Sequence, residues 1–176
     1  MSSNKSNIKS TNWVLSSLFL ALALVLPFLT GQFQELGNKL LPMHIPVLLC
    51  GFICGPIFGA IVGFISPLLR FALFGMPTIF PIGISMCFEL ATYGLVSGIL
   101  YSKHKDKKGI YLTLIISMLF GRVVWGITQF IIYGFDNVNF GLDIFVSAAF
   151  IQAIPGIVIQ IIIIPIIIMT LQKSKL

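Results

Sequence analysis

Two ionisable residues, Glu89 and Arg122, lie inside long apolar segments of this 176-residue chain. An unpaired charge near the centre of a bilayer costs at least about 2.5–3.5 kcal/mol, so each must face the protein interior, water or the other residue. A carboxylate and a guanidinium can form an ion pair that fixes two helices, or they can bind the polar groups of a ligand. The sequence leaves both roles open, and they can be combined if one partner exchanges the pair for ligand.

The predicted depths of the two charges favour a pairing. Arg122 is 12 residues into an apolar segment that starts near residue 110, which is about 18 Å along a helix. Glu89 is eight residues beyond Pro81, about 12 Å from the opposite end of its own segment. Two neighbouring antiparallel helices would therefore bring these residues to a similar level.

Polar and aromatic residues with helical spacing accompany both charges. Arg122, Trp125 and Gln129 are spaced by three and four residues, which puts them on one helix face. Glu89 has Ser85 and Tyr93 four residues to either side. A few hydrogen-bonding groups beside an aromatic wall suit a small polar ligand. With an amide from the last apolar segment and a histidine before the second, the predicted substrate site comprises Glu89, Arg122, Trp125, Gln129, Gln152, Ser85 and His44.

Three polar residues, one of them in this predicted site, have simpler interpretations beside a functional one. His44 lies where a polar segment meets an apolar one, so capping or packing competes with contact to the ligand from a lid. Arg70 is expected to extend its charged end to the membrane surface. Gln160 should lie deeper, toward the cytoplasmic side.

No enzyme or metal-binding motif is present in the sequence. The chain lacks G-x-S-x-G, H-E-x-x-H and the nucleotide-binding G-x-x-x-x-G-K-[ST]. Its three cysteines all lie in apolar segments and do not complete a zinc-like spacing with the two histidines, so buried free thiols are expected. We therefore predict a protein that is not an enzyme, has no ATPase of its own, and needs no metal or cofactor.

The composition assigns these residues to a membrane protein. The chain is 57% hydrophobic and 9% charged, with a mean hydropathy of +1.05, whereas a soluble domain is about 25% charged. The net charge of +6 does not indicate a nucleic-acid partner, because lysines cluster in three polar segments that flank the apolar runs. That distribution is typical of the cytoplasmic loops of membrane proteins.

The apolar segments predict a single-domain, all-α integral membrane protein with six transmembrane helices and both termini in the cytoplasm. Six spans put all three lysine-rich segments on one side. Five spans would result if residues 44–74 formed one kinked helix, but the charge bias disfavours that topology. The predicted helices cover about 13–30, 44–54, 56–74, 80–101, 110–133 and 144–171.

Small residues recur at every fourth position on three of these helices. Glycines between residues 51 and 63, and Gly94 with Gly98, should let helices pack closely within the bundle. Ser17 and Ala21 form a similar pair on the first helix. There, packing inside the bundle and docking of a partner's helix are both compatible with the sequence.

The chain resembles the substrate-binding S component of energy-coupling factor (ECF) vitamin transporters. The resemblance covers residues 13 to 172 and is carried by MHIPVLLCGFICGPIFGAIVGFISPLLRFALFGMP, then FELATYGLVSGILY and GRVVWG. It implies a bacterial plasma-membrane protein that binds its ligand in the outer half of the bundle. It also implies a transmembrane coupling protein and two cytoplasmic ATPases as partners, with Ser17 and Ala21 facing the coupling protein. Ser17 departs from the alanine that is usual in the family's motif. Toppling of the whole subunit would then carry the ligand inward.

The residues do not name the ligand. A free Arg122 would suit an anion such as pantothenate, whereas an Arg122–Glu89 pair would suit a neutral or weakly basic pyrimidine, thiazole or pyridoxine-type ring stacked on Trp125. Cobalamin would need a larger opening. A small membrane channel, a structural membrane scaffold and a membrane-embedded enzyme are the alternative classes, and the apolar cytoplasmic halves of the helices disfavour the channel.

Overall fold

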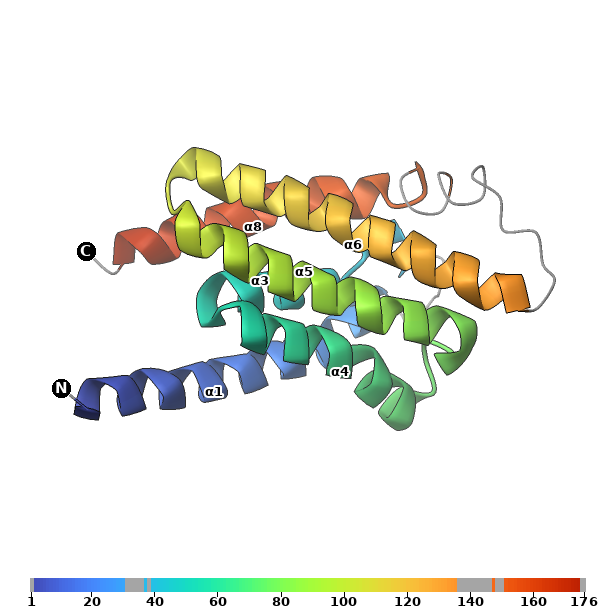
Figure 1. Ribbon diagram of the computed structural model, residues 1–176, viewed down its shortest axis with the longest axis horizontal. Coiled ribbons are helices and arrows are strands. Elements are labelled where there is room, and N and C mark those ends of the chain that lie inside the picture. The colour runs from blue at the N-terminus through green and yellow to red at the C-terminus, as the bar shows by residue number, and fades with distance from the viewer. Residues whose placement is uncertain (1, 31–36, 38, 136–146, 148–150, 175–176) are drawn as a thin grey trace.

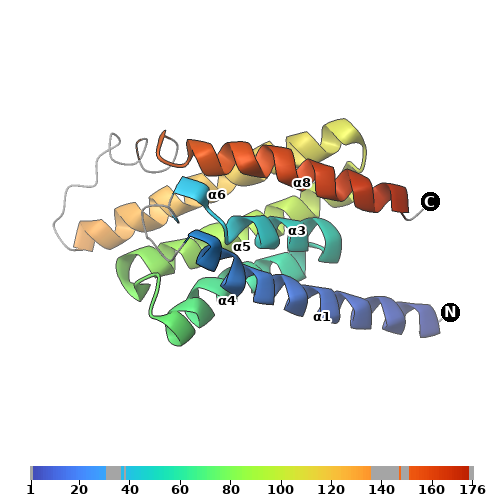
Figure 2. The same ribbon diagram turned by 180° about the vertical axis from the view of Figure 1, so that it is seen from behind.

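A computed structural model of the chain describes residues 2–30, 37, 39–135, 147 and 151–174, which are helical apart from short turns. Figures 1 and 2 show successive helices running in alternating directions, with the two termini at the same end of the bundle. The described helices are α1 (Ser2–Val25), η1 (Leu26–Thr30), α3 (His44–Cys54), α4 (Pro56–Phe74), η2 (Ile79–Gly83), α5 (Ile84–Lys103), α6 (Lys107–Phe135) and α8 (Ile154–Ser174).

Five stretches of these helices are long and apolar enough to cross a membrane, which confirms an all-helical, multi-pass membrane protein. They are Ser10–Phe28, Pro56–Phe74, Ile79–Lys103, Lys107–Tyr133 and Ile154–Ser174. The remaining apolar helix, α3, has 11 residues and reaches only about 16 Å, roughly half of a hydrocarbon core. It begins at the buried His44 and runs toward the end of the bundle where the termini lie (Figure 1). At its own end, Asn12 Nδ2 near the middle of α1 donates to the carbonyl oxygen of Cys54 at 3.4 Å.

The first helix differs from its predicted span of 13–30. It begins at Ser2, because a helix can continue into water beyond the apolar residues by which its start was predicted. At its other end, α1 stops at Val25 and the chain continues as a 3₁₀ helix. Pro27 explains this end, because its ring nitrogen cannot donate the next hydrogen bond of an α-helix.

The last helix starts later than predicted. Residues 147 and 151 are π-helical, residues 152–153 form a turn, and α8 begins at Ile154 rather than near 144. Residues 144–146 and 148–150 lie outside the described residues. Pro155 occupies the first turn of α8, where a missing N–H leaves no hydrogen bond unmade.

Glycine contacts bring α3, α4 and α5 into close contact at the centre of the bundle. A Cβ atom added to Gly94 would overlap the backbone of Gly59, and one added to Gly98 would overlap the backbone at Pro56. A Cβ atom at Gly51 would collide with Ser97 and Gly94. The structure thus confirms that these glycines serve packing within the bundle.

Arg70 holds α4 against the end of α1. Its side chain is 4% exposed, and Nη1 donates to the carbonyl oxygen of Leu24 at 2.8 Å, in the last turn of α1. The rings of Phe28 and Phe74 lie 5.3 and 5.6 Å from the guanidinium carbon. The expectation that Arg70 extends to the membrane surface is therefore wrong, because a helix-end carbonyl and two aromatic rings bind the charge inside the protein.

Candidate functional site

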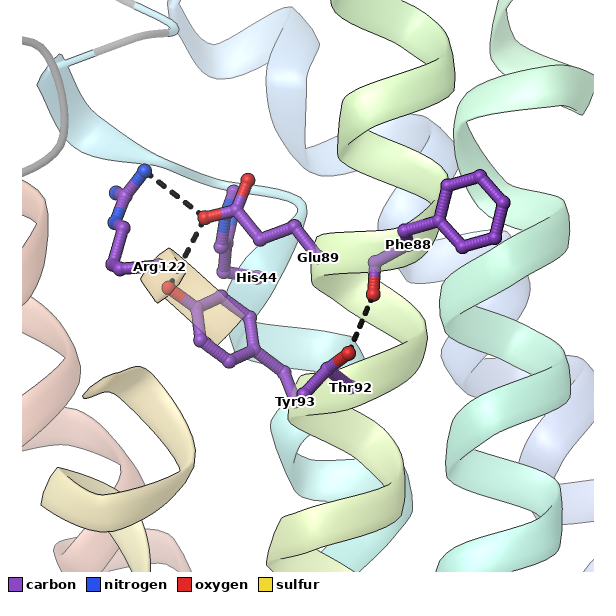
Figure 3. Close-up of polar contacts among 6 residues, drawn as sticks. All are labelled: His44, Phe88, Glu89, Thr92, Tyr93 and Arg122. Atoms are coloured by element: carbon purple, nitrogen blue, oxygen red, sulfur yellow. Dashed lines mark hydrogen bonds and ion pairs between the residues drawn. The ribbon is translucent and has the colours of Figure 1, made fainter. Parts of the chain in front are cut away.

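A buried ion-pair cluster joins three helices (Figure 3). One carboxylate oxygen of Glu89 on α5, Oε1, lies 3.0 Å from Nη1 of Arg122 on α6. The same oxygen accepts a hydrogen bond from the hydroxyl of Tyr93 at 3.2 Å and lies 3.5 Å from Nε2 of His44, the first residue of α3. Glu89 is 1% exposed and Arg122 is 5% exposed. The pairing expected from their depths is confirmed.

Close backbone packing brings the two charges together. Gly121, next to Arg122, has no side chain to keep α6 away, and a Cβ atom there would overlap the ring of Tyr93. Tyr93 lies one turn beyond Glu89 on α5, so its hydroxyl reaches back to the carboxylate. The ring of His44 packs against Tyr93 with centroids 5.2 Å apart. Aromatic contacts and a missing side chain thus determine where the polar groups meet.

The backbone before α3 directs His44 into the bundle. The N–H of His44 donates to the carbonyl oxygen of Leu41 at 3.1 Å, and Leu41 adopts a φ of 51°. Just before it, the backbone of Lys39 and Leu40 crosses α8 so closely at Gly156 that a Cβ there would meet both carbonyl groups. Packing, one of the two roles expected for His44, is therefore confirmed, and its position also puts it beside Glu89.

Several buried polar atoms inside the bundle have no hydrogen-bond partner among the described residues. They belong to four side chains: His44, Arg122, Gln129 and Gln160. On Arg122 these atoms are Nε and Nη2, and on Gln129 the atom is Oε1. Buried polar atoms are nearly always hydrogen-bonded in proteins, so each such atom requires an explanation. Three of the four side chains belong to the predicted substrate site.

The other predicted site residues lie at varying distances from this cluster. Ser85 is buried one turn before Glu89, and its hydroxyl donates to the carbonyl oxygen of Pro81 at 3.2 Å. Trp125 is half-buried. Gln152 lies in the turn before α8 with an exposed side chain, so the structure does not bring it into the buried cluster.

Tyr93 belongs to the cluster but was absent from the predicted set of site residues. Its position four residues after Glu89 was the available signal, since side chains with that spacing share a helix face. The structure adds that Tyr93 is 1% exposed inside the bundle, with its hydroxyl on the Glu89 carboxylate.

The small-residue pair on α1 lies outside the bundle. Ser17 and Ala21 are both exposed, whereas Ser16, Phe19 and Ala23 on the same helix are buried. The interpretation that places this pair in internal packing is therefore wrong. The surrounding surface is apolar, with Leu18 53% exposed.

The cysteines play no part in the cluster. Cys50, Cys54 and Cys87 are buried free thiols, as expected. Within the described ranges, no three side chains of the metal-ligating types His, Cys, Asp and Glu come together.

A comparison with protein families assigns the chain. The family described as "ECF transporter, substrate-specific component" matches residues 12–168. No curated protein and no solved structure matches the chain significantly. The family match covers most of the chain, including the helices that carry the ion-pair cluster. The chain is therefore a member of the ECF transporter substrate-specific component family, a multi-pass membrane subunit that is not itself an ATPase.

Proposed function

We propose that this protein is the high-affinity substrate-binding subunit of an ATP-driven ECF importer for a small water-soluble vitamin or vitamin precursor. The observation that supports this most is the ion-pair cluster at Glu89, where buried nitrogens of Arg122 and His44 have no hydrogen-bond partner among the described residues. Because burying such groups in a membrane protein costs free energy, their presence points to a function. A polar ligand would supply the missing hydrogen bonds.

The proposed substrate site has an inner and an outer part. Glu89, Arg122 and His44 form the buried inner part together with Gln129 and Ser85. Trp125 and the exposed Gln152 remain predicted contacts on the outer side. A ligand entering from outside would meet the outer residues before the ion pair.

The proposed topology has six spans with both termini in the cytoplasm. Both termini lie at one end of the bundle, the same end as the lysine-rich turn between α5 and α6 (Figure 1). Lysines concentrate on the cytoplasmic side of membrane proteins. In this topology the short helix α3 covers the cytoplasmic half of the second span.

The proposed partners are a transmembrane coupling protein and two cytoplasmic ATPases in a bacterial plasma membrane. The chain has no nucleotide-binding motif, so ATP hydrolysis must come from another subunit. The exposed pair Ser17 and Ala21 on α1 is the proposed contact with the coupling protein, since small residues let membrane helices approach closely.

Uptake by a reconstituted complex tests this function. The subunit would be co-expressed with a coupling protein and its ATPases, reconstituted in liposomes, and tested with radiolabelled vitamins in the presence and absence of ATP. We expect ATP-dependent accumulation of one vitamin, which should also raise the melting temperature of the isolated subunit. Flux without ATP would indicate a channel. If no vitamin in a broad panel stabilised the subunit and none was taken up, the proposed function would be contradicted.

A further inference from the structure

We propose that the ligand of this subunit carries a carboxylate, which binds the edge of Arg122 formed by Nε and Nη2. This inference rests on the proposed function and specifies the chemistry of the same site. Arg122 uses Nη1 to contact Glu89 at 3.0 Å. Its Nε and Nη2 are buried and have no partner among the described residues.

The two unpartnered nitrogens form one hydrogen-bonding edge. In a planar guanidinium, one N–H of Nη2 is parallel to the N–H of Nε, and both point away from the third nitrogen, Nη1. A carboxylate presents two oxygen atoms with matching separation, so it can accept both hydrogen bonds at once. A single carbonyl or hydroxyl oxygen can accept both only through bent hydrogen bonds, and it brings no negative charge to the cation.

Glu89 does not occupy this edge of Arg122. Because Glu89 contacts Nη1, a ligand carboxylate on the opposite edge would be separated from Glu89 by the cation itself. Figure 3 shows the other guanidinium nitrogens on the side away from Glu89 and Tyr93. Glu89 does not depend on Arg122 alone, since the Tyr93 hydroxyl and His44 contact the same oxygen. One guanidinium can therefore serve two carboxylates.

A second polar contact limits the shape of the ligand. Gln129 lies seven residues after Arg122, which is two turns along the same face of α6 and about 10 Å farther from the termini. Its buried Oε1 has no partner among the described residues. An elongated acid with a hydroxyl or amide group near its far end would satisfy both residues.

Matched pairs of acids and neutral analogues test the carboxylate. Binding to the purified subunit would be measured by calorimetry for pantothenate and pantothenyl alcohol, biotin and biotinamide, nicotinate and nicotinamide, and lipoate and lipoamide, together with pyridoxine and thiamine. We expect one acid to bind at least 100-fold more tightly than its neutral analogue. Equal binding within a pair, or binding of only neutral or cationic vitamins, would overturn the carboxylate inference and leave the proposed function intact. If nothing binds, the carboxylate inference fails, and uptake in liposomes decides whether the proposed function fails too.

Two variants separate the hydrogen-bonding edge from the charge. Arg122→Lys keeps the positive charge but lacks the paired N–H groups, so the acid should lose about 100-fold in affinity. If this variant does not fold, the double variant Glu89→Gln with Arg122→Gln removes both charges together and leaves no unpaired ion. It should bind the acid and its neutral analogue with similar affinity. An undiminished preference for the acid in either variant would overturn the inference.

Discussion

The ion pair between Glu89 and Arg122 should be asymmetric, so that losing the carboxylate costs more stability than losing the guanidinium. In Arg122→Met, Glu89 keeps the hydrogen bond from Tyr93 and the contact with His44. In Glu89→Leu, Arg122 loses its only ion-pair contact among the described residues, and its other two nitrogens named above already lack partners. The guanidinium is then buried without a partner among the residues that the structure describes.

The expected magnitudes follow from these contacts. Removing one partner of a buried ion pair costs about 3–5 kcal/mol, and a hydrogen bond to a charged group is worth about 1.5–3 kcal/mol. Since Glu89 retains such a bond, Arg122→Met should lie near the lower value and Glu89→Leu near the upper one. The free energies of unfolding should therefore differ by about 1–2 kcal/mol. The double variant should lose at least about 2 kcal/mol less than the sum of the two single losses, because it leaves no unpaired ion.

The free energy of unfolding of all four proteins would be measured in mixed micelles by titration with sodium dodecyl sulfate. Circular dichroism would monitor the loss of helix. The wild type and the double variant complete a double-mutant cycle, so coupling between the two residues is obtained directly. A loss for Arg122→Met that equals or exceeds the loss for Glu89→Leu would refute the reasoning. So would additive losses, since they would show that the two side chains do not interact.

Three further predictions concern packing and assembly. Gly94→Ala should destabilise the fold by about 1–3 kcal/mol, because its Cβ would overlap the backbone of a neighbouring helix. The control Gly37→Ala, whose Cβ would meet no atom within 4 Å, should leave the melting temperature nearly unchanged. Equal effects would contradict the packing argument. Arg70→Met should lower the free energy of unfolding by about 1–3 kcal/mol, because it removes the charged hydrogen bond to the end of α1; unchanged unfolding would show that this bond does not hold the two helices. Ala21→Trp should abolish both uptake and co-purification with the coupling protein. Because the residue is exposed, the ligand affinity of the isolated subunit should stay nearly unchanged. A retained complex, or joint loss of fold and binding, would count against docking at this face.

Much of the fold could be predicted from hydropathy, because each helix that crosses a membrane needs a long apolar segment. The bounds of α3 and α4 agree with the predicted 44–54 and 56–74, since Gly55-Pro56 ends one helix and starts the next. Helix ends in water were predicted less well. The start of α1 lies among polar residues. The start of α8 lies at Pro155, inside an apolar stretch, so hydropathy alone does not reveal it.

The candidate site could be predicted only in part. The depths of Glu89 and Arg122 follow from residue counts along two antiparallel helices, and these counts favoured a contact without excluding a separate ligand-binding role. Which nitrogen of Arg122 remains without a partner depends on side-chain conformation, so the sequence alone could not reveal it. The position of Gln152 also could not be predicted. The predicted start of α8 was ten residues too early, so Gln152 was placed within the helix instead of in the turn before it.

The ion-pair cluster owes its geometry to apolar contacts rather than to the charges themselves. Gly59 and Gly94 fix α5 against α4, and Gly121 fixes α6 against the ring of Tyr93, so backbone and ring contacts determine the separation of Glu89 and Arg122. Charged side chains on loosely packed helices would have to be ordered by the ligand, at a cost in conformational entropy. Here most of that cost is met when the protein folds, so a small ligand with few hydrogen bonds can still bind tightly. A side chain added at Gly121 should therefore weaken ligand binding, although the glycine itself makes no polar contact in the cluster.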